Sequence, residues 1–322
     1  MHSWPYLSHT MRATITKESS LRAYLDLFRL PNLFTAAADI FAGFFFSGGL
    51  PAEWPVLVRL SFASMCLYAA GVALNDYCDR DVDAVERPSR PLPSGRVKPG
   101  RALQLILVLF IAGLSLAFSL SVQTGAIAAL LVVCVVAYDA VLKHTPVAPL
   151  LMGGCRALNL AMGMYFVADF TSLTTLRPIA IVCLYITAVT FFARTEARRS
   201  DRARLVLGVL GQIVALSGLW WVWRYTPNAR HHEFVYLAGA LALSILYNGI
   251  RAIQDPKPHA SARATSPHSA MSRVQLAVKR SILGLVVLDA CIAWSVAGPE
   301  AAAITLALLV PTVLLARFLP VT

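Results

Sequence analysis

The sequence predicts an all-α, polytopic transmembrane helical bundle with a central cavity. Three observations support this fold class. Hydrophobic residues make up 57% of the chain and charged residues 14%, whereas roughly a quarter of a soluble domain is charged. Long apolar stretches recur along the whole length, and the basic residues are concentrated in alternate loops between them. We therefore expect a helical membrane protein.

Ten apolar stretches have a length and composition suited to a membrane span, which takes about 20 apolar residues in helical form. The last two are separated only by Gly298-Pro299-Glu300, so the prediction is nine or ten spans. In order, they cover residues 25–48, 56–75, 102–121, 124–142, 148–168, 178–193, 205–223, 234–253, 281–297 and 300–319.

The net charge of +11 could suggest a nucleic-acid partner, but its distribution argues against one. Alternate loops, with both tails, carry 23 of the 28 Lys and Arg residues. An excess of basic residues on one side marks the cytoplasmic face. We expect a multi-pass protein of the cell membrane, with its N-terminus and its most acidic loop in the cytoplasm, and the lipid bilayer rather than nucleic acid as its surroundings.

The domain prediction is one integral-membrane domain over residues 1–322. Residues 1–22 are expected to form a cytoplasmic tail. Residues 254–272, rich in Pro, Ser, Ala and His, are expected to form a flexible cytoplasmic linker.

The acidic loop after the second stretch is the strongest functional signal. Five of the seventeen acidic residues fall between positions 76 and 86, beside hydrocarbon, where charge is costly to maintain. Asp76, Asp79 and Asp83 are spaced i, i+3, i+7, which places them on one face of a helix. Carboxylate oxygens suit Mg²⁺, and Mg²⁺ held by carboxylates commonly also holds substrate phosphates. The following prolines should break the helix, and the arginines among them suit phosphate.

This loop resembles the first aspartate-rich motif of the UbiA superfamily of intramembrane prenyltransferases, and the segment Tyr138-Asp139-x-x-Leu142-Lys143 resembles a second family stretch. The resemblance implies an isoprenyl diphosphate donor bound through Mg²⁺ in a cavity open to lipid. It implies that Asp76, Asp79 and Asp83 are metal ligands and that Asn75 orients them. Phosphate contacts are expected from Arg87 and Lys143, and an aromatic contact from Tyr138.

Arg156 lies within the fifth stretch, where an ionisable residue either faces a cavity with a partner or extends to the nearby membrane surface. Asn159, one turn further on, is expected to share its face. Asp39 and Asp289 also lie in apolar stretches and are candidates to line the cavity or to pair with Arg156 or Lys279.

The second aspartate-rich motif of the superfamily is reduced here. Between the sixth and seventh stretches the chain offers Glu196 and Asp201 among four arginines, Arg194 being the first. We expect Arg194 and Glu196 to contact substrate, with arginines taking part in direct diphosphate binding. Together with residues 38–43 and 275–290, this segment resembles the EboC-type UbiA-like branch.

Two functions remain open at this point. The first is Mg²⁺-dependent transfer of an isoprenyl group from a prenyl diphosphate to a small or lipid-like acceptor. The alternative is a catalytically reduced relative that binds or translocates a polyprenyl or other amphiphilic molecule. A cation channel is disfavoured, because the acidic residues cluster in one loop.

Overall fold

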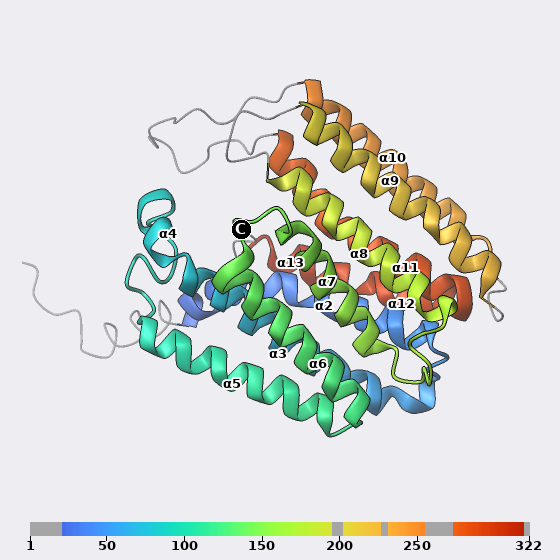
Figure 1. Cartoon of the computed structure of the whole chain (residues 1–322), viewed down its shortest axis with the longest axis horizontal. Coiled ribbons are helices and arrows are strands. Elements are labelled where there is room, and N and C mark those ends of the chain that lie inside the picture. The colour runs from blue at the N-terminus through green and yellow to red at the C-terminus, as the bar shows by residue number, and fades with distance from the viewer. Residues whose placement is uncertain (1–20, 195–201, 227–230, 255–272, 319–322) are drawn as a thin grey trace, which may run out of the picture.

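The computed structural model describes residues 21–194, 202–226, 231–254 and 273–318, and these ranges fold almost entirely into helices (Figure 1). The principal helices are α2 (Leu30–Phe46), α3 (Trp54–Cys78), α4 (Arg80–Glu86), α5 (Pro99–Phe118), α6 (Val122–Ala137), the π-helical turn η2 (Tyr138–Leu142), α7 (Ala148–Gly163), α8 (Leu173–Ala193), α9 (Arg202–Tyr225), α10 (Phe234–Gln254), α11 (Arg273–Ala297), α12 (Pro299–Ala307) and α13 (Leu309–Leu315). A short 3₁₀ turn, η1 (Pro51–Glu53), precedes α3. The prediction of an all-helical fold is confirmed.

Each of the ten apolar stretches coincides with a helix. Within the part of the chain that the structure describes, six helices are long and apolar enough to cross a membrane: α3, α5, α6 with η2, α8, α9 and α10. By contrast, α2 and α7 have 17 and 16 residues, and the last stretch is divided into α12 and α13. The total of nine or ten spans therefore stays a prediction. The expected tail and most of the expected linker lie outside the described residues.

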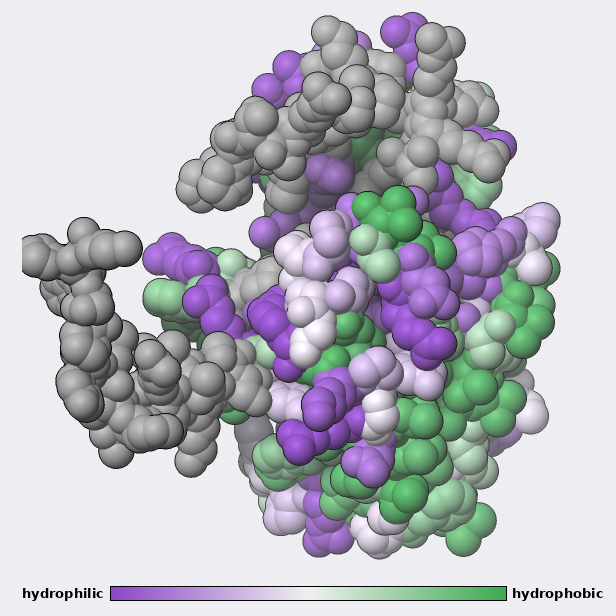
Figure 2. Space-filling view, turned by 90° about the vertical axis from the view of Figure 1, so that its left-hand side faces the viewer, coloured by the Kyte–Doolittle hydropathy of each residue, from purple (hydrophilic) through white to green (hydrophobic). Residues whose placement is uncertain are grey.

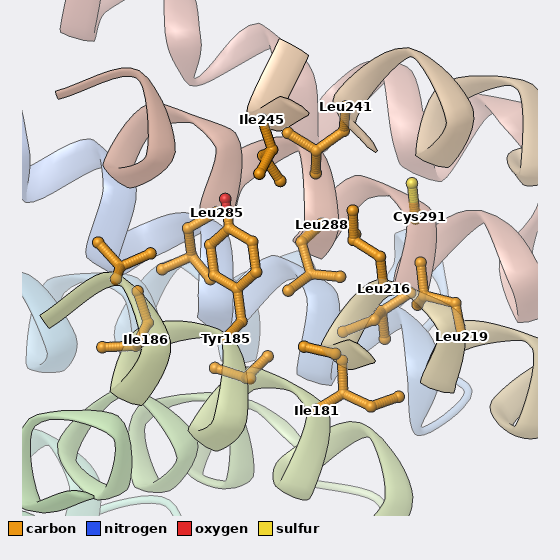
Figure 3. Packing of buried hydrophobic residues seen from close by; sticks show 14 of the residues in the cluster. Ile181, Tyr185, Ile186, Leu216, Leu219, Leu241, Ile245, Leu285, Leu288 and Cys291 are labelled. Atoms are coloured by element: carbon orange, nitrogen blue, oxygen red, sulfur yellow. The ribbon is translucent and has the colours of Figure 1, made fainter. Parts of the chain in front are cut away.

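The helices pack around two apolar clusters. One is formed mainly by α8, α9, α10 and α11, and Figure 3 shows its centre, where Tyr185 of α8 lies among Leu241, Leu285 and Leu288. The Tyr185 hydroxyl donates to the carbonyl of Ser281 at 2.9 Å, so this buried polar group is satisfied. The other cluster joins α2, α3, α5 and α6. In Figure 1, α3, α5 and α6 lie on one side of the bundle and α9 and α10 on the opposite side.

Close contact between α2 and α7 depends on two glycines. A Cβ atom on Gly43 would lie 2.2 Å from the carbonyl oxygen of Leu160, and one on Gly163 would lie 2.6 Å from that of Ile40. Small residues allow helix backbones in membranes to approach in this way. Because α2 carries Asp39 and α7 carries Arg156, this approach also determines whether those charges meet.

Gly163→Ala is expected to destabilise the protein by about 1–3 kcal/mol, because the new methyl group overlaps α2 backbone that cannot yield locally. Gly154→Ala in the same helix is the matched control, since no atom lies within 4 Å of its would-be Cβ. That control should be neutral or stabilising by up to about 1 kcal/mol. Thermal unfolding in detergent measures both variants, and equal stability of the two would contradict the predicted tight approach.

One end of the bundle carries α4 and the irregular segment after it (Figure 1). The prediction that the prolines after Glu86 end the helix is confirmed, since α4 stops there and α5 begins only at Pro99. Figure 2 looks onto this end, where hydrophilic side chains are spread over the surface and hydrophobic ones gather at the lower right. The predicted metal ligands Asp76, Asp79 and Asp83 lie toward this end, where α3 meets α4.

Candidate active site

A cavity of about 550 Å³ lies between α3, α6, η2 and α7. Its two ends differ in chemistry. On α3, Ser64 and Asn75 both line it, and eleven helical residues span about 16 Å. We name the end near Asn75 the carboxylate end and the end near Ser64 the Arg156 end. The lining residues are Arg29, Ser64, Leu67, Tyr68, Gly71, Val72, Asn75, Asp79, Arg87, Arg90, Leu131, Val135, Tyr138, Asp139, Lys143, Met152, Cys155, Arg156, Asn159 and Ala193.

At the carboxylate end, the predicted aspartates follow one helical path despite a break. α3 ends at Cys78 and α4 begins at Arg80. The amide of Asp79 nevertheless donates to the carbonyl of Asn75 at 3.0 Å, and the amide of Asp83 to that of Asp79 at 2.8 Å. Because these i→i−4 bonds continue across the break, the i, i+3, i+7 spacing still acts as it would on one helix.

Each of the three carboxylates is paired with a basic side chain. Arg29 lies 2.8 Å from Asp76. One nitrogen of Arg90, Nη1, lies 3.2 Å from Asp76 and 2.5 Å from Asp83. Lys143 contacts Asp79. Asp76 and Asp83 are buried, whereas the Asp79 side chain is 23% exposed. Burial of two carboxylates is tolerated here because both are ion-paired and hydrogen-bonded.

Asp81 behaves differently from its neighbours. Its side chain is 89% exposed and lies 3.5 Å from Arg80. Asp81 therefore pairs with an arginine at the surface instead of joining the other three carboxylates.

The turn η2 brings a fourth carboxylate to the same end. Asp139 lines the cavity, and its Oδ1 accepts a hydrogen bond from the amide nitrogen of Asn75 at 2.7 Å. A π-helical turn holds one residue more than an α-helical turn and often occurs at functional sites. Here it presents Tyr138, Asp139 and Lys143 to one cavity. Arg194, at the end of α8, supports this turn by donating to the carbonyl of Lys143 at 2.7 Å.

Arg29 occupies a costly backbone conformation at this site. Its φ of 45° and ψ of 56° lie in the left-handed region, and no other non-glycine residue of the described ranges has a positive φ. Such conformations cost about 1–3 kcal/mol and occur mainly where surrounding structure fixes them. The bond to Asp76 is one such restraint, and it directs the Arg29 side chain to the cavity.

At the Arg156 end, buried polar groups join α2, α3 and α7. Arg156 lies 3.2 Å from Asp39 and donates to the hydroxyl of Thr35 at 3.1 Å. The amide of Asn159 donates to Asp39 at 2.8 Å and accepts from Ser64 at 2.8 Å. Arg156 is 9% exposed and lines the cavity, so it does not extend to the membrane surface. Its guanidinium carbon lies 5.6 Å from the centre of the Tyr68 ring, within cation–π range.

The expectations for the two intramembrane aspartates are thereby resolved. Asp39 pairs with Arg156 and, like Asp289, is absent from the cavity lining. Both are fully buried, and the two carboxyl groups interact with each other.

Most of the predicted site residues gather around this cavity. Asn75, Asp79, Arg87, Tyr138, Lys143, Arg156 and Asn159 line it, and Asp76 and Asp83 lie directly behind it. Arg194 contacts the backbone of Lys143 rather than the cavity. Glu196 lies outside the described residues.

Sequence reasoning did not select Arg29, Arg90, Asp139 or Ser64 as site residues. Arg90 stands in the same proline-rich run as Arg87, and Asp139 follows Tyr138 directly. Their adjacency to selected residues was the available signal. For Ser64 no such signal exists, because a serine within a span is usually a packing residue.

The carboxylate oxygens at this end are the type of ligand that Mg²⁺ prefers. Four carboxyl groups lie there, those of Asp76, Asp79, Asp83 and Asp139, and basic side chains contact the first three. Within the described ranges, however, no three acidic, His or Cys side chains are grouped to hold a metal ion. The basic side chains lie between the carboxylates instead.

Comparison with known proteins agrees with this architecture. Residues 36–273 match the model of the UbiA prenyltransferase family. A digeranylgeranylglyceryl phosphate synthase of Methanopyrus kandleri is 38% identical over 148 residues, which is 44% of this chain and 54% of the relative. That of Sulfurisphaera tokodaii is 28% identical over 243 residues, or 70% and 86% of the two chains. The chain thus spans about half the length of the first of these relatives and most of the second.

Solved structures share the fold. A UbiA homolog from Aeropyrum pernix K1 superimposes with a TM-score of 0.64 at 16% identity, covering 81% of this chain and 96% of its own. A UbiA homolog from Archaeoglobus fulgidus bound to GPP and Mg²⁺ gives 0.58 at 12% identity, covering 88% and 99%. The family match covers well over half of the sequence, and the chain belongs to the UbiA prenyltransferase family.

Proposed function

We propose that this protein transfers an isoprenyl group from a prenyl diphosphate to a small or lipid-like acceptor within the membrane, with Mg²⁺ as cofactor. Family membership supports the reaction class. The relatives named above are synthases, and the Archaeoglobus homolog was solved with GPP and Mg²⁺. The observation that carries the proposal is the carboxylate end of the cavity, where acidic and basic side chains face one apolar chamber.

In this proposal Asp76, Asp79 and Asp83 are the metal ligands. Asn75 orients the group through its bond to Asp139, which holds η2 against α3. These residues would hold Mg²⁺, which would supply positive charge to the diphosphate leaving group. Asp139 lies close enough to be a further ligand or to orient one.

The basic side chains stabilise the leaving diphosphate. Arg29, Arg87, Arg90 and Lys143 all line the carboxylate end. Cationic hydrogen-bond donors held in place for developing negative charge lower the barrier, because they need no reorganisation during the reaction. Arg194 acts on this step by fixing the Lys143 backbone. Glu196 is proposed to contact substrate, as in the sequence-based expectation.

The middle of the cavity protects the reacting carbon. Leu67, Val72, Leu131 and Val135 form apolar walls, which exclude the water that would otherwise capture an allylic cation. The rings of Tyr68 and Tyr138 also line the cavity, and aromatic faces attract cations. Prenyl transfer therefore requires both a charged end and a dry centre, and the cavity has both.

The Arg156 end is proposed to bind a polar group of the acceptor. Arg156 and Asn159 line it, and the five N–H groups of the Arg156 guanidinium outnumber its contacts to Asp39 and Thr35. A hydroxyl, carbonyl or anionic oxygen of the acceptor would accept from a remaining N–H group. The proposed arrangement places donor diphosphate and acceptor polar group at opposite ends, with the reacting carbons between them.

The same proposal places the carboxylate end at the cytoplasmic face of the cell membrane. The distribution of basic residues supports this orientation. A water-soluble prenyl diphosphate made in the cytoplasm would then reach the site directly.

The test is a turnover assay with purified protein in lipid nanodiscs. Labelled prenyl diphosphates of several chain lengths are incubated with Mg²⁺ and a membrane lipid extract as acceptor source. We expect diphosphate release together with a labelled, organic-soluble product, both lost on EDTA addition and restored by excess Mg²⁺. Binding of the donor without turnover, across chain lengths and acceptors, would instead support the carrier alternative.

A further inference from the structure

Arg90 bridges two of the carboxylates that are proposed to hold the metal. Its Nη1 lies between Asp76 and Asp83, at 3.2 and 2.5 Å, and the side chain is 12% exposed. Lys143 stands in the same relation to Asp79. Mg²⁺ binds oxygen at about 2.0–2.1 Å in a strict octahedron. Because Arg90 and Lys143 already neutralise these carboxylates and repel a further cation, they compete with the metal for the same site.

Both basic side chains also face the space where a diphosphate would lie. Arg90 and Lys143 line the cavity at the carboxylate end. Arginine and lysine side chains bind both phosphate oxygens and carboxylates. Each can thus exchange an acidic partner in the protein for an oxygen of the ligand.

We infer that Arg90 and Lys143 are built-in counter-cations that exchange partners when substrate binds. Without ligand they neutralise Asp76, Asp79 and Asp83. When divalent metal and diphosphate bind together, the metal takes the carboxylates and the two basic side chains take phosphate oxygens. This inference rests on the proposed function, and it adds that metal and diphosphate bind as a coupled pair.

The coupling follows from the partners that each ligand leaves behind. If the metal binds alone, it displaces Arg90 and provides no new anion for the guanidinium group. If the diphosphate binds alone, it draws Arg90 away from the buried carboxylates of Asp76 and Asp83, which are left with one cation fewer. Unpaired buried charges are costly. When both ligands are bound, every charged group has a partner. Each ligand should therefore increase the affinity of the protein for the other by the same factor.

Arg90→Gln tests this directly, because it removes the competitor while keeping a side chain of similar shape. Titration with MnCl₂, followed by the electron paramagnetic resonance signal of the free ion, measures metal binding without any prenyl donor. In the absence of diphosphate, we expect the variant to bind Mn²⁺ about tenfold more tightly than the wild type, equivalent to about 1.4 kcal/mol. Inorganic pyrophosphate should tighten Mn²⁺ binding strongly in the wild type and much less in the variant.

Arg87→Gln is the matched control. Arg87 has the same charge and lines the same end of the cavity, but no acidic side chain of the described ranges lies within ion-pair distance of its guanidinium. Its loss should change metal-only affinity far less than the loss of Arg90. Equal tightening in both variants would indicate only a change in local charge and would overturn the exchange.

Mn²⁺ affinity equal to or weaker than that of the wild type in Arg90→Gln would also overturn the inference. If that variant does not fold, Arg90→Lys replaces it, and its affinity for Mn²⁺ should lie above that of the wild type because one ammonium bridges two carboxylates less well. The readout is independent of turnover. A protein without transferase activity that still shows the tightening would contradict the proposed function and support the exchange.

Discussion

Replacing Asp79 by alanine is expected to lower prenyl transfer by at least about 10²–10³-fold while the protein remains folded in the membrane. Among the three predicted metal ligands, Asp79 is the one that lines the cavity. Removing one preorganised electrostatic group from a site of charge development typically costs this much in rate. Asp83→Ala should have a similar effect, with an additional loss of stability because Arg90 then lacks its shorter contact.

Asp81→Ala provides the control for both variants. Asp81 lies two residues from both Asp79 and Asp83 and carries the same charge, but its side chain is exposed and lies near Arg80. Transfer of label from prenyl diphosphate to product should stay near the wild-type rate. Retained activity in Asp79→Ala, or a comparable loss in Asp81→Ala, would remove the metal-site assignment.

Replacing Arg156 by methionine is expected to destabilise the protein by about 3–5 kcal/mol. Asp39 and Asp289 are both fully buried, and their carboxyl groups interact with each other. Arg156 lies 3.2 Å from Asp39 and also attracts Asp289. Removing one partner of a buried ion pair leaves uncompensated charge, and losses of this size are typical.

The double variant Arg156→Met/Asp39→Asn should recover much of this loss, because the uncompensated carboxylate is removed together with its partner. A double-mutant cycle from thermal or SDS-induced unfolding measures the coupling. Arg59→Met is the control for the change of residue type, since Arg59 is exposed on α3. Additive effects of the Arg156 and Asp39 substitutions would contradict the ion pair as a source of stability.

The proposed roles of the two charged clusters are separable by these experiments. Variants at the carboxylate end should reduce turnover and alter metal binding with small effects on unfolding, apart from Asp83. Variants at Arg156 should act first on stability. Arg156→Lys keeps the charge. If this variant remains folded but its turnover falls, the loss would reflect the proposed contact between Arg156 and the acceptor.

Much of the helical architecture was accessible from the sequence, because hydrophobic length is a local property. A stretch of about 20 apolar residues can satisfy its own backbone in lipid as a helix, and each of the ten stretches contains a helix in the structure. The break after Glu86 was equally local, since proline ends a helix through its own geometry. The number of spans was not fixed in this way, because α2, α7, α12 and α13 are short.

The spacing of Asp76, Asp79 and Asp83 was a second local feature, and with it came the prediction of a diphosphate site. Their partners were not predictable from spacing. Arg29 and Lys143 reach these aspartates from 47 and 64 residues away, and Arg156 reaches Asp39 across 117. Those pairs form because α2, α3, η2 and α7 pack against one another, with glycines at the α2–α7 approach.

A helical membrane protein with three aspartates on one helical face thus follows from local sequence alone. Which cations neutralise them, and which polar residues close the other end of the cavity, follows from the way the helices pack. Helix formation and side-chain periodicity depend on neighbours in the chain. Charge pairing depends on which helices come within a few ångströms, and that is set by packing over the whole bundle.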